Sequence, residues 1–210
     1  MNKDRLFTTP IWHEHKIEFL KSLDKASNKY IKDTRKKEKE EIKKNKDFGT
    51  SHHSVQLINS NEFLDFRNYV GKKSHEFLIE QGFNMNEHSL AMTEMWVQEF
   101  SKNGGGHHSA HIHWNQHVCG FYFLRCNEET SYPIFHDPRT GARATKLPIL
   151  DDAISNGGED LINFKPVPGA LLFFPGYLEH HFTVDHGKHP FRFIHFTLQA
   201  FPKQIFNNEN

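Results

Sequence analysis

The first third of the chain repeats its apolar residues with the period of an α-helix. From Glu14 to Tyr30 they fall on one face, which is formed by Phe19, Leu23, Ala26 and Tyr30. A second helix is predicted from Glu62 to Gln81, and its apolar stripe consists of Phe63, Phe66, Val70 and Phe77. Gly82 is a suitable end for this helix because glycine readily adopts the left-handed conformation that closes helices.

The segment between these two helices is dominated by charge. Residues 32–47 read KDTRKKEKEEIKKNKD, with acidic and basic side chains interspersed. Such a run is typical of a solvated helix extension or a mobile loop whose charges pair with one another, and we assign it no function. Residues 1–82 are therefore expected to form a mostly helical N-terminal part.

Beyond Gly82 the pattern changes to short apolar runs separated by turn residues. The strands predicted from these runs are Met92–Phe100, Ala110–His113, Val118–Leu124, Pro133–His136, Ala170–Phe174 and Phe191–Leu198. Several short strands of this kind favour a sandwich or barrel. We expect one domain over residues 1–210 of the α+β class, mainly β, with its β-core in 90–202 and the helices packed on one face. The acidic, glycine-rich stretch 151–160 predicts a loop, either a surface insertion or a lid.

Composition narrows the class of protein. Lys+Arg and Asp+Glu both number 26, and this balance argues against a nucleic-acid binder, which needs a positive excess. No apolar run approaches the length of a membrane span, and the N-terminus lacks the apolar segment of a signal peptide, so we expect a cytoplasmic protein. Cys119 and Cys126 are too few for a disulfide framework, and we expect both to be reduced.

The 17 histidines are clustered, with five between 107 and 117 and five more between 180 and 195. In a strand, His111 and His113 would project to the same side about 6.6 Å apart, close enough to share one ion. His180 is the candidate third ligand, and the adjacent His181 is the alternative. Three neutral imidazoles suit Fe(II), Zn, Cu or Ni, and three protein ligands leave the open positions of a catalytic site.

A single arginine lies among apolar residues in the last predicted strand. Alternation along FRFIHFTL places Arg192 on the same face as Ile194, Phe196 and Leu198, which indicates a core-facing guanidinium. A buried arginine needs a partner, and its planar fork suits a carboxylate. That partner is either a bound carboxylate ligand or an acidic side chain, for which the candidates are Asp137, Glu94 and Glu99.

A series of motifs covers nearly the whole chain. In chain order they are LFTTPIW at 6–12, WVQ at 96–98, HIH at 111–113, CGFYFL at 119–124, FHDPR at 135–139, GALLFFPGYLEH at 169–180 and the strand at 192–196. Taken in this order, they resemble the family of 2OG-Fe(II) oxygenases found in bacteria and phages. The resemblance implies a double-stranded β-helix, a jelly-roll or cupin-like barrel.

The resemblance also implies a function and a set of site residues. Members of the family bind Fe(II) through two histidines and a carboxylate, and they use 2-oxoglutarate as cosubstrate and O2 as oxidant. His111 then corresponds to the first ligand, His180 to the last, and Arg192 to the residue that holds the distal carboxylate of 2-oxoglutarate. His113 occupies the position of the family's carboxylate, so the third ligand is either His113 itself or Asp137.

Other site residues and other functions remain open at this level. Tyr122 is a candidate contact to the cosubstrate, and His107, His108 and His117 are candidate contacts around the site, each with an equal case for a structural role. The substrate is a small molecule or a protein side chain, and a homodimer is one alternative for the oligomeric state. The rival functions are a cupin-like metalloenzyme that does not use 2-oxoglutarate and a non-enzymatic phage or host interaction module.

Overall fold

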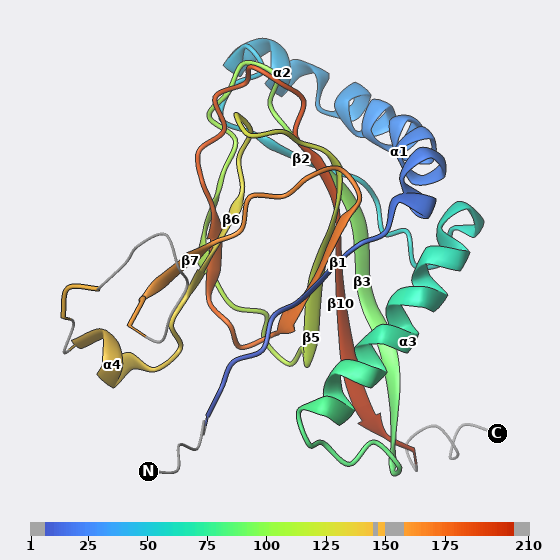
Figure 1. Cartoon of the computed structure of the whole chain (residues 1–210). Coiled ribbons are helices and arrows are strands. Elements are labelled where there is room, and N and C mark those ends of the chain that lie inside the picture. The colour runs from blue at the N-terminus through green and yellow to red at the C-terminus, as the bar shows by residue number, and fades with distance from the viewer. Residues whose placement is uncertain (1–6, 145–146, 150–157, 204–210) are drawn as a thin grey trace.

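Two antiparallel sheets face each other in the computed structural model, which describes residues 7–144, 147–149 and 158–203 (Figure 1). The larger sheet contains, in order, β1 (Trp12–His15), β8 (Ala170–Pro175), β5 (Val118–Arg125), β10 (Arg192–Pro202), β3 (His88–Phe100) and β2 (Ser51–His53). The smaller sheet contains β4 (His108–His111), β9 (His180–Phe182), β6 (Pro133–His136) and β7 (Leu161–Asn163).

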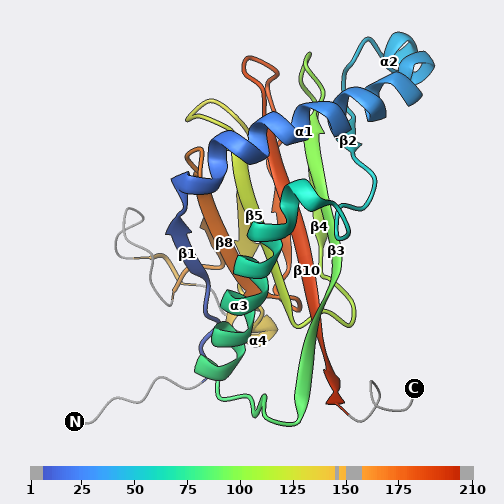
Figure 2. The same cartoon turned by 90° about the vertical axis from the view of Figure 1, so that its right-hand side faces the viewer.

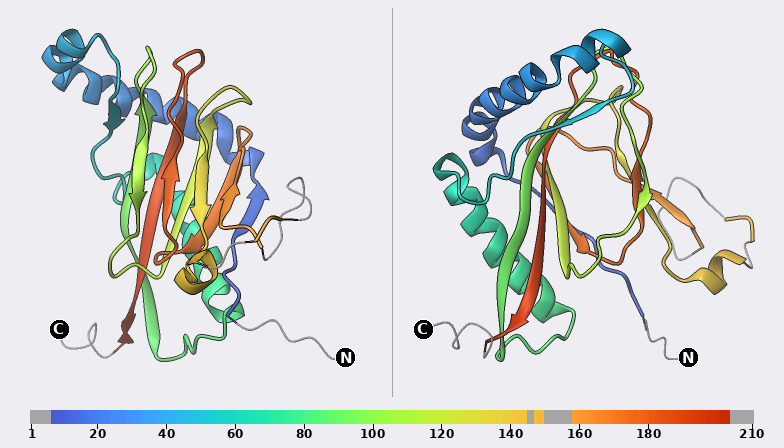
Figure 3. Two further views of the ribbon diagram at one scale, coloured as in Figure 1. Left: turned by 90° about the vertical axis from the view of Figure 1, so that its left-hand side faces the viewer. Right: turned by 180° about the vertical axis from the view of Figure 1, so that it is seen from behind.

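The chain crosses repeatedly between the two sheets. It runs from β3 to β4, back to β5, across to β6 and β7, back to β8, and then through β9 to β10. The order β8-β5-β10-β3 therefore lies opposite β7-β6-β9-β4, which is the connectivity of a double-stranded β-helix (Figure 3). The predicted fold class is confirmed.

The N-terminal helices cover the outer face of the larger sheet (Figure 2). They are α1 (Ile17–Lys37), α2 (Lys39–Asn45), a short 3-10 helix at Asn61–Phe63 and α3 (Leu64–Glu80), whereas the short α4 (Thr140–Ala144) lies beside the smaller sheet. The charged segment 32–47 is thus largely helical. The first helix begins later than its apolar pattern predicts because Trp12–His15 pairs with β8.

The larger sheet is buried on both faces. One apolar cluster fills the space between the helices and the sheet and includes Leu23, Phe66, Val70, Ile194 and Phe196. A second cluster fills the space between the two sheets and includes Phe100, Phe121, Phe182, Phe191 and Phe193. Successive residues of β10 therefore enter two different cores, since side chains alternate along a strand.

Several predicted features shift in the structure. The strand predicted at Ala110–His113 is observed at His108–His111, so His113 lies beyond its end, where its N–H donates to the Gly176 carbonyl at 2.9 Å. Both cysteines are free, as expected. Most of the predicted loop 151–160 falls outside the described residues. Within the described part, no helix is long and apolar enough to cross a membrane.

Candidate metal centre

Three histidines converge where β4 and β9 meet. His111 is the last residue of β4 and His180 the first of β9, and the two are directly paired across the sheet. His113 approaches from the turn that follows β4. One ring nitrogen from each histidine lies within 4.8 Å of the other two, so the structure brings together all three ligands expected from the sequence.

Backbone carbonyls fix the orientation of two of these rings. The Nδ1 atom of His111 lies 2.7 Å from the Ser109 carbonyl oxygen, and that of His180 lies 2.9 Å from the Leu178 carbonyl oxygen. A carbonyl can only accept, so each Nδ1 carries the proton and each Nε2 keeps a free lone pair. This arrangement orients histidines for metal coordination.

Two of the inward-facing nitrogens are buried without a partner. The Nε2 atoms of His113 and His180 have no hydrogen bond within the described part of the chain. Buried polar atoms are rarely left unpaired because the cost is about 1–3 kcal/mol each. A divalent cation among the three imidazoles would satisfy both nitrogens, so the residues present fit a metal ion.

The surroundings keep His113 and His180 neutral. Burial lowers the pKa of His180 to about 3 and that of His113 to about 4, and repulsion from His111 adds to the effect in both cases. Only a neutral imidazole can bind a metal. At neutral pH, His113 and His180 are therefore in the form that coordinates a metal.

Two residues not expected from the sequence join this cluster. His195, on the inner face of β10, stacks on His113 with ring centroids 4.9 Å apart, and its Nε2 is likewise buried without a partner among the described residues. Glu94, on β3, forms with His113 and His195 a second group whose ligand atoms lie within 4.8 Å of one another. Glu94 thus brings a carboxylate beside the position where the HIH motif lacks one. Alternation along β10 could have indicated His195, which lies on the face opposite Arg192.

Arg192 lies on the other side of the larger sheet. Its Nε donates to Glu99 at 2.8 Å, and its Nη1 donates to Ser27 and Asn28, both at 2.8 Å. Arg192 therefore forms an ion pair with Glu99, which is one of the acidic partners that the sequence offers. Arg192 shares the helix-facing side of β10 with Ile194, so its position does not fit contact with a ligand at the histidines.

The remaining candidates are also placed. The Tyr122 hydroxyl donates to the Lys16 carbonyl at 2.6 Å on the helix-facing side, away from the histidines. Both carboxylate oxygens of Asp137 accept hydrogen bonds from Arg139, and no ligand group in the described residues includes Asp137. His108 lies close to the centre, with its ring centroid 6.0 Å from that of His111.

His107 and His117 have local partners outside the cluster. The Nδ1 atom of His107 contacts the Gly105 carbonyl at 3.0 Å, and the Nδ1 atom of His117 accepts a hydrogen bond from the Ala200 N–H at 3.1 Å. Aromatic rings occupy the space inside the barrel beside the three histidines. Phe121 lies with its centroid 5.7 Å from His180, and Phe174 lies 4.8 Å from His180.

The fold is a double-stranded β-helix, and its site is a cluster of histidines that could hold a metal ion. Residues 94–195, which include all five clustered residues, match the family model described as "Putative 2OG-Fe(II) oxygenase". Over this segment, which is just under half of the chain, the protein is similar to the 2OG-Fe(II) oxygenase family. No curated protein matches the chain.

Solved structures share the fold at low sequence identity. AviO1 from Streptomyces viridochromogenes Tue57 aligns with a TM-score of 0.60 and 12% identity, over 91% of this chain and 90% of its own. A Pseudomonas putida prolyl-4-hydroxylase aligns with a TM-score of 0.55 and 11% identity, over 92% of this chain and 94% of its own. The epimerase SnoN, solved with Fe3+, alpha ketoglutarate and nogalamycin RO, aligns with a TM-score of 0.53 and 11% identity, over 92% of this chain and 81% of its own.

Proposed function

We propose that the chain is an Fe(II)- and 2-oxoglutarate-dependent dioxygenase whose metal is held by His111, His113 and His180. The observation that carries this proposal is the convergence of three imidazole nitrogens, two of them buried without a partner. The family match supports iron as the metal and 2-oxoglutarate as the cosubstrate. The substrate would be a small molecule or a protein side chain.

In this proposal, the groups around the three histidines orient the metal ligands and exclude water. With O2, the bound metal and cosubstrate supply the oxidative chemistry, in which 2-oxoglutarate gives succinate and CO2 while the substrate is hydroxylated. The Ser109 and Leu178 carbonyls hold the rings of His111 and His180 in the coordinating orientation. Three protein ligands leave positions open for ligands that take part in the reaction. The rings of Phe121 and Phe174 exclude water from the inner side of His180.

The charge of this site differs from that of two histidines and a carboxylate. With His113 in the carboxylate position, the three ligands are neutral and the site is one charge more positive. We infer that Glu94 offsets this difference from outside the triad, because its carboxylate lies within 4.8 Å of a His113 ring nitrogen. The hydroxyl of Thr197 donates to Glu94 at 3.4 Å and helps to hold it there.

A second candidate is a metal-dependent enzyme of the same fold that does not use 2-oxoglutarate. The position of Arg192 favours it. The guanidinium expected to hold the distal carboxylate is engaged by Glu99 on the far side of the sheet. Both candidates share the metal centre and differ in the cosubstrate alone.

Succinate formation tests the first candidate. The protein is incubated aerobically with Fe(II) and 2-oxoglutarate, and we expect succinate above the level of an iron-free control. His180→Ala should reduce succinate to that background, whereas His181→Ala should not, because His181 forms a hydrogen bond with His136 outside the triad. If the protein binds iron and leaves 2-oxoglutarate unchanged, the first candidate is wrong and the second holds.

A further inference from the structure

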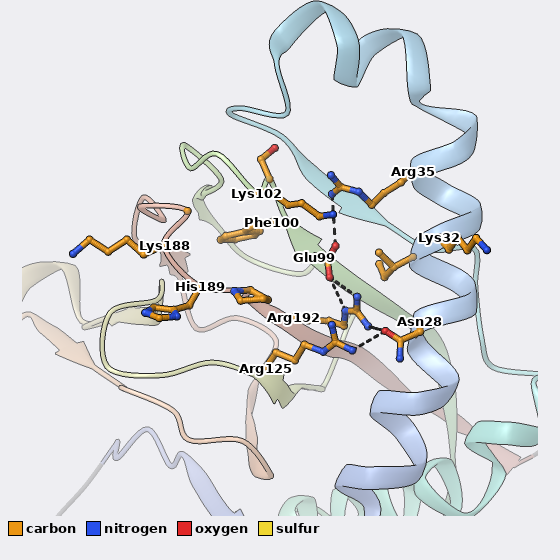
Figure 4. A pocket seen from close by; sticks show the side chains of 14 residues that line it. Asn28, Lys32, Arg35, Glu99, Phe100, Lys102, Arg125, Lys188, His189 and Arg192 are labelled. Atoms are coloured by element: carbon orange, nitrogen blue, oxygen red, sulfur yellow. Dashed lines mark hydrogen bonds and ion pairs between the residues drawn. The ribbon is translucent and has the colours of Figure 1, made fainter.

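A basic pocket lies between α1 and the ends of β3 and β10 (Figure 4). It has a volume of about 630 Å³, and its lining includes none of the clustered metal-site residues. Sites for small molecules usually have volumes of about 300–1,000 Å³. The pocket is therefore large enough for a small organic ligand that binds separately from the metal centre.

The lining of this pocket is strongly cationic. Six lining side chains are basic and one is acidic, namely Lys32, Arg35, Lys102, Arg125, Lys188 and Arg192 against Glu99. Four of the six have an acidic partner: Arg35 pairs with Asp47, Arg125 with Asp24, Lys188 with Glu129 and Arg192 with Glu99. Lys32 and Lys102 pair with no carboxylate in the described part of the chain. Lys102 points toward Glu99, whereas Lys32 points away from it at the edge of the pocket, so one unpaired positive charge lies inside the pocket and a second lies at its rim (Figure 4).

One guanidinium nitrogen at this pocket is a free donor, and a second guanidinium is crowded by a neighbouring cation. The Nη1 atom of Arg35 is buried without a hydrogen bond in the described residues, and a carboxylate oxygen of Glu99 lies 3.6 Å from it. Burial lowers the pKa of Arg192, and the nearby charge of Arg125 lowers it further against the opposing effect of Glu99. Figure 4 shows Arg35, Lys102 and Arg192 all pointing toward Glu99. An anion here would satisfy a free donor and relieve repulsion among cations.

We propose that this pocket binds a small phosphomonoester. A phosphate group of this type carries about −1.5 to −2 charges at neutral pH, which matches the two unpaired lysines. Its oxygens suit the planar donors of a guanidinium. Pro190 lines the same pocket and is exposed, so it offers an apolar surface to the organic group of the ester.

Isothermal titration calorimetry with phenyl phosphate, inorganic phosphate and succinate tests this site. We expect wild-type protein to bind phenyl phosphate more tightly than inorganic phosphate, because of the apolar wall, and more tightly than succinate. The double variant Lys32→Gln/Lys102→Gln should bind phenyl phosphate at least about tenfold more weakly, since it loses both unpaired charges. The matched control Lys36→Gln/Lys37→Gln removes two exposed lysines of α1 outside the pocket and should leave the affinity unchanged.

Four results would overturn the proposal. The first is no binding of phenyl phosphate to wild-type protein. The second is an equal loss of phenyl phosphate affinity in the two double variants, which would indicate a non-specific charge effect. The third is tighter binding of succinate than of phenyl phosphate, which would exclude the phosphate class. His180→Ala should retain phenyl phosphate binding, because loss of binding in that variant would place the ligand at the metal centre instead. Circular dichroism of each variant confirms that it is folded.

Discussion

Replacement of Arg192 by methionine separates a structural from a cosubstrate-binding role for this residue. The guanidinium is 5% exposed and is held by Glu99, Ser27 and Asn28. Removing one partner of a buried ion pair costs about 3–5 kcal/mol, because it leaves an uncompensated charge. Arg35 also approaches Glu99, at 3.6 Å, and compensates part of that charge. We therefore expect Arg192→Met to lower the free energy of unfolding by about 3 kcal/mol, near the lower end of this range.

Urea unfolding and a 2-oxoglutarate titration provide the two assays for this variant. The double variant Arg192→Met/Glu99→Met should recover most of the lost stability, because apolar residues can replace a buried pair at little cost. The 2-oxoglutarate concentration needed for half-maximal succinate formation should not change in Arg192→Met. An unchanged free energy of unfolding, together with a several-fold higher requirement for 2-oxoglutarate, would show that Arg192 faces the histidines and would refute this reasoning.

Two further predictions concern stability. Burial raises the pKa of Asp47, but the hydrogen bond with His52 and the charge of Arg35 outweigh it, so the folded-state pKa lies below 3.8. The stability that this carboxylate contributes is complete above its unfolded-state pKa and is lost as pH falls through its folded-state pKa. Between about pH 5 and pH 3, the free energy of unfolding should therefore fall more in wild type than in Asp47→Asn. Equal decreases in the two proteins would contradict this prediction. A Cβ at Gly120 would lie 2.2 Å from the Leu172 carbonyl oxygen, so Gly120→Ala should lower the unfolding free energy by about 3 kcal/mol. The control Gly71→Ala has open space in α3 and should raise it by up to about 1 kcal/mol, whereas similar values for both variants would exclude close packing at Gly120.

The two faces of β10 show what the sequence pattern can predict and what it cannot. Alternation correctly grouped Arg192 with Ile194, Phe196 and Leu198, and all four lie on one face. It could not show which core that face enters, because the helices bury one side of the sheet and the smaller sheet buries the other. An apolar face thus indicated burial without indicating proximity to the histidines.

The sequence predicts the three histidines of the candidate metal centre, but it does not predict the residues that surround them. The clustering of histidines and the family resemblance indicated His111, His113 and His180, and the structure brings them together. Strand alternation does not by itself bring His113 beside His111, because β4 ends at His111 and the following turn positions His113. Glu94 joins the cluster through pairing between β3 and β10, a long-range register that no local pattern contains.

The proposed function requires the three histidines to act together as iron ligands. Anaerobic equilibrium dialysis against Fe(II), followed by measurement of bound iron, tests this point with wild type, His180→Ala and the adjacent control His181→Ala. Thermal unfolding confirms that both variants are folded. We predict about one Fe(II) per chain in wild type and in His181→Ala, and a loss of this iron in His180→Ala. Wild-type iron content in folded His180→Ala would contradict the assignment.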